Sequence, residues 1–189
     1  MPLKDLHRFY FTMPEIDYLI SLAKCPRDKA ILRVLSRTGI RVGELLGIEG
    51  KDLDHFHGTI LIHAEKGGDY KAKRRLVPAD LETLIQLRSL RPGIPELFDI
   101  TRQRVDQIIK AVCQDAGLGR LLDFYSGSMT KPHAHTFRHS FAMHWIKVHG
   151  QDAILELSKV LGHSDIKTTM AYLRYSGQEL HQAYDKLWQ

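Results

Sequence analysis

The 189-residue sequence predicts one mainly α-helical domain with a small antiparallel β-sheet. Three observations lead to this fold class. Apolar residues recur at helical spacing along most of the chain, between recognisable helix start and stop signals. Between residues 48 and 77 the pattern changes to short β-prone runs separated by glycines. The chain has no internal repeat, low-complexity tract or clear linker that would divide it into two domains.

The first helices are bounded by residues that start or stop a helix. Thr12 and Glu15 form a capping box that begins the first helix. This helix ends before Pro26, because the residue that precedes a proline is disfavoured in helical geometry. A second helix ends at Gly39, which can adopt the left-handed conformation of a C-cap. A short third helix is expected over Arg41–Gly47.

A hairpin of two β-prone runs follows, and the rest of the chain is again helical. Thr59–Ile62 and Arg75–Val77 are the two runs, with Gly67 and Gly68 between them. Residues 118–131 are rich in glycine and serine, which predicts a loop and the best candidate for a mobile segment. The remaining helices are expected near residues 79–90, 101–116, 134–148, 153–161, 165–173 and 176–187.

The helix expected at 134–148 has an apolar stripe that we expect to pack on the core. The stripe consists of Phe137, Phe141, Trp145 and Val148. Such a stripe places the polar side chains next to it at the edge of the core.

The composition favours a soluble cytoplasmic protein with a polyanionic partner. The formal net charge is +5 at pH 7, although charge alone does not separate DNA from RNA or a membrane surface. The N-terminus has no apolar signal segment, and no stretch has the length and hydrophobicity of a membrane span. Cys25 and Cys113 lack metal-ligand spacing and are expected to be ordinary buried thiols.

Four side chains between residues 133 and 175 are spaced as one site would require. His135 and Arg138 are three residues apart and are therefore neighbours on one face of a helix. His163 follows a glycine, and Tyr172 comes nine residues later. A tyrosine among arginine and histidine side chains suggests covalent chemistry on a phosphate.

Five segments carry a family resemblance: TGIRVGELLGI, EKGG…KRRLVP, HTFRHSFAMHW, LGHS and TTMAYLRY. In this order they resemble the tyrosine recombinases, also called the phage integrase family. The resemblance begins near Thr12 and implies the catalytic-domain fold of this family for residues 12–189, with a C-terminal helix at 176–187 after an entry arm at 1–11. Most members carry a further N-terminal DNA-clamping domain, the core-binding domain. We expect it to be absent here, so that the chain is a fragment or a member of a minimal single-domain subgroup.

The resemblance implies a site-specific DNA recombinase or integrase. Such an enzyme cleaves and rejoins DNA through a 3′-phosphotyrosyl intermediate, with no metal, ATP or other cofactor. The implied partners are double-stranded DNA and further copies of the chain, assembled as a tetrameric synapse through the C-terminal helix. The implied location is the cytoplasm, on the nucleoid, with no membrane association. Two alternatives stay open: a type IB topoisomerase that relaxes supercoils, and a non-catalytic DNA-binding regulator that keeps the fold.

By resemblance, Tyr172 is the nucleophile. Tyr175 is a rival whose spacing from His163 differs from the family pattern. His135 matches the candidate proton acceptor for Tyr172, and His163 matches the donor to a nonbridging phosphate oxygen.

Arg41 and Arg138 match the two arginines that hold the phosphate. Guanidinium suits this role because its planar fork donates to two oxygens at once. Glu44, one turn after Arg41, is expected to hold that arginine in place. Lys66, before the two glycines, matches the general acid that protonates the leaving 5′-oxygen, and Lys71 or Lys73 is the alternative.

Two further groups have competing interpretations. The basic run Lys71, Lys73, Arg74 and Arg75 is expected to contact the DNA backbone, the alternative being a solvated strand edge. His133, His135 and His139 include the i,i+4 spacing of a zinc pair. However, no glutamate follows in the HExxH pattern and Arg138 lies between the pair, so no metal site is predicted. His133 and His139 are instead expected to pack or to face the DNA.

Overall fold

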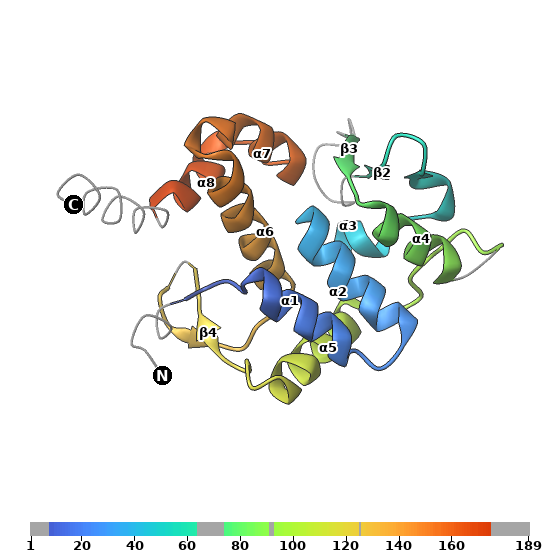
Figure 1. The fold of residues 1–189 in the computed structure, drawn as a ribbon, viewed down its shortest axis with the longest axis horizontal. Helices are drawn as coiled ribbons and strands as arrows, with labels where there is room; N and C mark the ends of the chain where they lie inside the picture. Colours follow the sequence, from blue (N-terminus) through green and yellow to red (C-terminus); the bar gives the residue numbers. More distant parts are fainter. Residues whose placement is uncertain (1–7, 64–73, 91–92, 125, 175–189) are drawn as a thin grey trace.

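The computed structural model describes residues 8–63, 74–90, 93–124 and 126–174 (Figure 1). This part of the chain is mainly helical with two small antiparallel sheets, which confirms the predicted fold class. The α-helices are α1 (Met13–Leu22), α2 (Pro26–Thr38), α3 (Val42–Leu46), α4 (Leu81–Leu90), α5 (Arg102–Asp115), α6 (Ala134–His149), α7 (Ile154–Leu161) and α8 (Ile166–Met170). Three 3-10 turns are η2 (Gly50–Asp52), η3 (Gln151–Ala153) and η4 (Ala171–Arg174). The strands are β1 (Leu53–Asp54), β2 (Thr59–Ile62), β3 (Arg75–Pro78), β4 (Leu121–Leu122) and β5 (Met129–Thr130).

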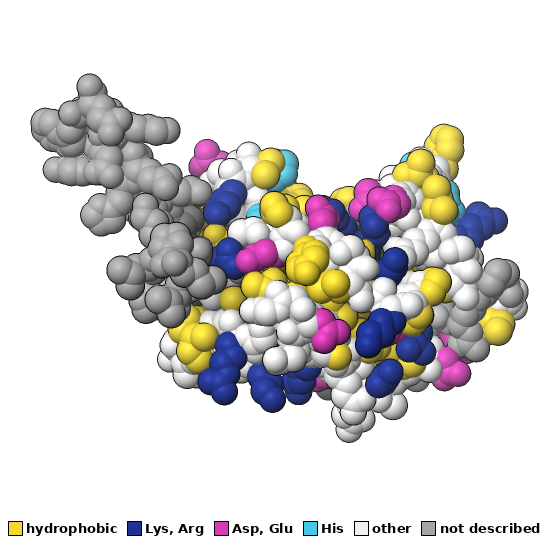
Figure 2. Space-filling view, turned by 60° about the horizontal axis from the view of Figure 1, so that its bottom comes forward, with side chains coloured by type: hydrophobic (Ala, Val, Ile, Leu, Met, Phe, Trp, Pro, Cys, Tyr) yellow, Lys and Arg dark blue, Asp and Glu magenta, His cyan; other side chains and the backbone are white. Residues whose placement is uncertain are grey.

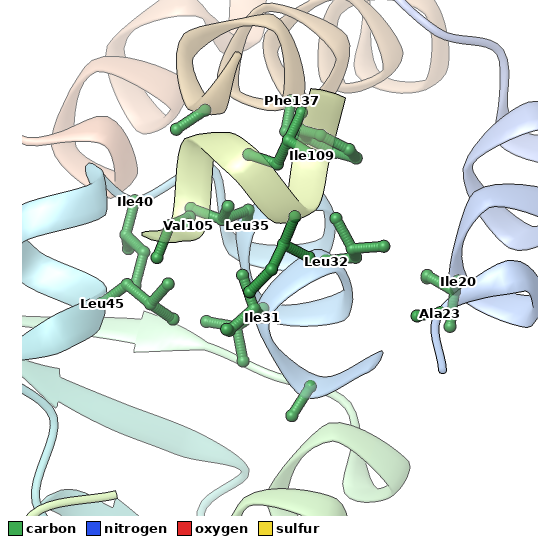
Figure 3. Packing of buried hydrophobic residues seen from close by; sticks show 14 of the residues in the cluster. Ile20, Ala23, Ile31, Leu32, Leu35, Ile40, Leu45, Val105, Ile109 and Phe137 are labelled. Carbon is green, nitrogen blue, oxygen red and sulfur yellow. The ribbon is translucent and has the colours of Figure 1, made fainter. Parts of the chain in front are cut away.

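Helix α2 is the centre of the larger hydrophobic core. It contacts α1, α3, α4, α5 and α6, and its Ile31, Leu32 and Leu35 are fully buried. Figure 3 shows these side chains packed with others from the surrounding helices, among them Ile109 and Phe137. Each buried aliphatic side chain contributes about 1.5–3 kcal/mol to the stability of the fold. This packing therefore holds α2 in place, together with the segment after its C-terminal end, which carries Arg41.

The three-stranded sheet has the order β1-β2-β3, with all neighbours antiparallel. Its register pairs Ile60 with Val77 and Ile62 with Arg75. Side chains alternate between the two faces of a strand, and directly paired residues share a face. Ile60, Ile62 and Val77 are buried, so Arg75 lies on the covered face of the sheet. Arg74, which precedes β3, is exposed.

A smaller apolar cluster joins α6, α7 and η4. It contains Phe9, Phe124, Ala142, Met143, Ile146, Leu157, Leu161 and Tyr172. Helix α6 belongs to both clusters, since Phe137 packs in the larger one. Tyr172 is 2% exposed, so its ring is anchored in the packing of the protein.

Three details differ from the prediction. Residues 118–131 contain the β4–β5 hairpin, closed where Asp123 accepts hydrogen bonds from the backbone and hydroxyl of Ser126. The prediction that Val148 faces the core was wrong, because it is 76% exposed. It lies two positions, or about 200° of helix rotation, from the buried Ile146. The helix expected at 165–173 divides into α8 and η4.

Some predicted features lie outside the described residues. They are the glycine pair of the first hairpin, Lys66, Lys71, Lys73, Tyr175 and the C-terminal helix at 176–187. Within the described part, no helix has the length and apolar character needed to cross a bilayer. Both cysteines are free thiols. Cys113 is buried as expected, and burial raises its pKa to about 12, whereas Cys25 is half-buried.

Candidate active site

A pocket of about 150 Å³ brings together side chains from distant parts of the chain. Five of the residues assigned from the sequence line it: Arg41, His135, Arg138, His163 and Tyr172. Its other lining residues are His139, Ser164 and Thr168. The described lining residues include no carboxylate, so their side-chain charge is positive.

Arg138 is the best-fixed cation of the pocket. It is 3% exposed, and its guanidinium donates to the carbonyl oxygens of Gly39 at 2.8 Å and Leu161 at 2.9 Å. These carbonyls belong to the C-terminal ends of α2 and α7, where the helix dipole favours a positive charge. Burial, with the nearby charge of Arg41, lowers the pKa of Arg138 to about 10, so it stays charged at neutral pH.

Gly39 makes this arrangement possible. Its φ is +64°, a left-handed conformation that residues with a Cβ rarely adopt. A Cβ there would also lie 2.5 Å from the ring of Phe141. The glycine thus ends α2 and directs a carbonyl at Arg138.

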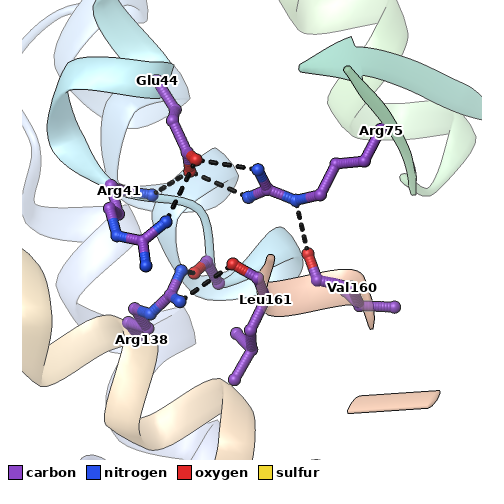
Figure 4. Close-up of polar contacts among 7 residues, drawn as sticks. Arg41, Glu44, Arg75, Arg138, Val160 and Leu161 are labelled. Atoms are coloured by element: carbon purple, nitrogen blue, oxygen red, sulfur yellow. Dashed lines mark hydrogen bonds and ion pairs between the residues drawn. The ribbon is translucent and has the colours of Figure 1, made fainter. Parts of the chain in front are cut away.

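Arg41 is held by the carboxylate of Glu44, as predicted from their spacing. The Arg41 backbone N–H donates to Glu44 Oε2 at 2.8 Å, and its guanidinium donates to Oε1 at 3.3 Å (Figure 4). Glu44 is 4% exposed. Burial raises the pKa of its carboxyl, but the hydrogen bonds from Arg75 and Arg41 outweigh this, and the pKa is lowered overall. Glu44 is therefore a buried anion that orients Arg41.

The second partner of Glu44 is Arg75, which the sequence grouped with the basic run. Its guanidinium donates to both carboxylate oxygens, at 2.8 and 2.9 Å, and its Nε donates to the carbonyl of Val160 at 2.9 Å. Arg74, one residue earlier, is exposed. The sequence contained a signal for this difference. Arg75 and the core residue Val77 are two residues apart in a strand, so their side chains lie on the same face of the sheet.

Tyr172 directs its hydroxyl at His139, whose ring Nδ1 lies 2.9 Å away. The His139 ring is stacked on Phe124 with 4.6 Å between centroids. Burial, with the charges of His135 and His133, lowers the pKa of His139 to about 3. The imidazole is therefore neutral at neutral pH, and in its Nε2-protonated tautomer Nδ1 accepts the hydrogen bond of the tyrosine hydroxyl. Sequence reasoning placed His139 on the face of His135, since they are four residues apart, but did not connect it with Tyr172.

The other two histidines occupy different environments. His135 is exposed at the pocket. His163 is half-buried, and its Nδ1 lies 2.7 Å from the hydroxyl of the buried Thr169. Burial, with the charges of Arg138 and Arg41, lowers the pKa of His163 to about 4. His163 is therefore a neutral hydrogen-bonding group at neutral pH.

His133 is not among the residues that line the pocket. It is the N-cap residue of α6. Its backbone N–H donates to the hydroxyl of Thr136 at 3.1 Å. Among the described residues, no group of three or more histidine, cysteine or carboxylate side chains is arranged to hold a metal ion.

One face of the molecule carries charges of both signs (Figure 2). On the face shown in Figure 2, lysine and arginine side chains are spread out, with carboxylates and apolar side chains between them. The pocket, in contrast, concentrates guanidinium and imidazole groups around one tyrosine hydroxyl. Chemically, the pocket can hold an anion with several acceptor oxygens and present a phenol to it.

Comparison with known proteins gives consistent matches. Tyrosine recombinase XerC of Myxococcus xanthus is 32% identical over 184 residues, which is 92% of this chain and 57% of that protein. Tyrosine recombinase XerA of Pyrococcus horikoshii is 29% identical over 183 residues, covering 93% and 60%. The chain thus spans little more than half the length of these relatives.

Solved structures share the fold. The crystal structure of XerA recombinase matches with a TM-score of 0.68 and 26% identity, over 95% of this chain and 65% of that one. XerH recombinase in a post-cleavage complex with its difH substrate matches with a TM-score of 0.70 over 98% and 55% of the two chains, and its 22% identity indicates the fold alone. The model of the phage integrase family matches residues 10–179. Because this match covers most of the chain, and side chains of four of the five motifs line one pocket, the chain belongs to the phage integrase family.

Proposed function

We propose that this protein cleaves and rejoins double-stranded DNA through a covalent bond between Tyr172 and a 3′-phosphate, as a site-specific recombinase. One observation carries the proposal: the hydroxyl of Tyr172 lies in a pocket whose described lining has two arginines, three histidines and no carboxylate. This is the environment that a phosphodiester and an attacking phenol require.

In this proposal Arg41 and Arg138 hold the nonbridging oxygens of the scissile phosphate. Both are positioned before DNA arrives, Arg41 by Glu44 and Arg138 by two backbone carbonyls. Preorganised donors need no rearrangement as charge develops in the transition state, which is why they accelerate the reaction. His163 is the third donor. If the Thr169 hydroxyl donates to Nδ1, the neutral ring carries its proton on Nε2 and can donate it to an oxygen.

The nucleophile has to lose a proton that it holds firmly. A tyrosine with its ordinary pKa near 10 is only about 0.1% ionised at pH 7. His139 orients the hydroxyl, but an imidazole with a pKa of about 3 cannot retain the proton. We therefore assign His139 the orienting role and the exposed His135 the role of acceptor.

The bonds formed and broken in the proposed reaction balance, so the reaction needs no ATP. The Tyr172 oxygen forms a bond to phosphorus, the bond from phosphorus to the 5′-oxygen breaks, and the 5′-oxygen takes a proton to become a hydroxyl. Lys66 is the proposed proton donor, with Lys71 or Lys73 as the alternative, and the exposed Arg74 is a proposed contact to the DNA backbone. Attack by a 5′-hydroxyl on the phosphotyrosine reverses these steps and rejoins the strand.

The DNA partner and the assembly of the chain are both part of the proposal. The XerH structure cited above is a complex with a DNA substrate, which supports duplex DNA as the partner. Residues 12–189 are the proposed catalytic unit, with residues 176–187 joining four protomers in a synapse on the nucleoid. Truncation after Ser176 is expected to reduce strand exchange more than single-strand cleavage, and an equal loss of both would contradict this role.

Two alternative functions would give different reaction products from those of a recombinase. A type IB topoisomerase would relax supercoiled DNA with no defined cleavage site. A DNA-binding regulator would bind without forming a covalent adduct. No observation in the described structure favours either.

The test is to incubate the protein with DNA of its host and to map covalent protein–DNA adducts. Wild-type protein is expected to give adducts at defined sites, and a nicked suicide substrate built on such a site should trap them. Tyr172→Phe keeps the buried ring and should abolish the adduct, whereas the matched Tyr175→Phe should retain it. A full-strength adduct in Tyr172→Phe would overturn the assignment, and the absence of a wild-type adduct on all host DNA would overturn the function.

A further inference from the structure

The side chain of Arg75 connects two segments that are far apart in the sequence. On one side it donates two hydrogen bonds to Glu44, which in turn holds Arg41. On the other side its Nε donates to the carbonyl of Val160, in the last turn of α7 (Figure 4). Its side chain is 15% exposed, so it is a structural part of the site and has little surface available for DNA.

The α7 end of this connection leads directly to His163. Helix α7 closes through Gly162, in the left-handed conformation, and the His163 backbone N–H donates to the carbonyl of Ser158 at 3.1 Å. The Arg75 guanidinium packs against this turn, since a Cβ on Gly162 would lie 2.8 Å from it. The position of Arg75 therefore constrains the turn that presents His163.

We infer that Arg75 is a positioning residue that sets the placement of Arg41 relative to His163, and that it does not contact the DNA backbone. This inference rests on the proposed function, because positioning matters only if Arg41 and His163 act on one phosphate. The planar guanidinium is essential to the role. It donates to a carboxylate in a bidentate manner and to a carbonyl at the same time, whereas an ammonium group has no fixed fork.

Three variants separate positioning from DNA contact. Arg75→Lys keeps the charge and loses the fork, Arg75→Met removes both, and Arg74→Met is the matched control at the exposed neighbour. Adduct formation is measured on a suicide substrate at saturating DNA, DNA affinity is measured across a salt series, and folding is followed by urea denaturation.

Arg75→Lys is expected to slow adduct formation by about 100-fold per folded molecule, since displacement of a catalytic group by about 1 Å has an effect of this order. Its DNA affinity and salt dependence should match the wild type. Arg74→Met should weaken DNA binding and reduce the salt slope by about one. If Arg75→Lys reduces the salt slope and keeps the wild-type adduct rate, or loses only stability, the inference is wrong.

A measurement without DNA keeps this test independent of the proposed function. The charge of Arg75 contributes to the lowered pKa of His163, so NMR titration of the histidine rings should show the His163 pKa raised in Arg75→Met. In Arg74→Met it should be unchanged. Absence of a wild-type adduct would refute the proposed function alone. An unchanged His163 titration in Arg75→Met would refute the contact between Arg75 and the His163 turn.

Discussion

His139 makes the stability of this protein depend on pH in a defined direction. In the unfolded chain a histidine has a pKa near 6.5, and in the folded protein burial holds the pKa of His139 at about 3. Between these values the unfolded state binds more protons, so the free energy of unfolding rises with pH and falls on acidification. Below about pH 6.5 the protein should progressively lose the stability that a neutral His139 provides.

The size of this loss follows from the two pKa values. Each pH unit below 6.5 costs about 1.4 kcal/mol for one such group, so His139 alone removes about 2 kcal/mol between pH 7 and pH 5. In the folded protein His139 takes up a proton only near its pKa of about 3, so the partner of the Tyr172 hydroxyl is retained at pH 5. Between pH 7 and pH 5, covalent adduct formation per folded molecule should therefore be little changed by His139, although the folded protein is less stable.

The assay is urea denaturation at pH 7 and pH 5, with wild type and two matched variants. His139→Asn cannot titrate in this range, and its side-chain oxygen can still accept a hydrogen bond. It should lose about 2 kcal/mol less than wild type between the two pH values, whatever its stability at pH 7. His149→Asn replaces an exposed histidine of the same helix and controls for the loss of one histidine. An equal loss in wild type and His139→Asn would refute the reasoning.

Three further predictions concern the ion pairs of Glu44, the turn at Gly162 and the need for a metal ion. Glu44→Gln should destabilise the fold by about 3 kcal/mol in urea, because it removes the buried anion shared by Arg41 and Arg75, and a loss under about 1 kcal/mol would contradict that ion pair. Gly162→Ala should cost about 1–2 kcal/mol from its φ of +68° alone, with more from the 2.8 Å approach to Arg75, so unchanged stability would contradict the described turn. Adduct formation should continue in excess EDTA, since arginine, lysine and histidine side chains take the place of a cation in the proposed mechanism. Inhibition that magnesium or zinc reverses would refute that mechanism.

Much of the fold could be predicted because its signals are local. The Thr12–Glu15 capping box and the Gly39 C-cap are present where the sequence placed them. The hairpin at residues 121–130 was missed, because its strands have only two residues each and depend on a turn closed by Asp123. Val148 was misplaced because helical spacing allows more than one face, and only packing against other elements selects one.

The sequence by itself determined which residue types gather at the site. Motif order and spacing indicated Arg41, Arg138, His163 and Tyr172, and one helical turn was enough to pair Arg41 with Glu44. Only the tertiary structure decided which side chains meet across distant segments. It directed Arg75 inward to Glu44 and Val160, and it placed a neutral His139 against the Tyr172 hydroxyl. The physical reason is that hydrogen-bond partners and desolvation depend on the packing of several elements, which no local stretch of sequence contains.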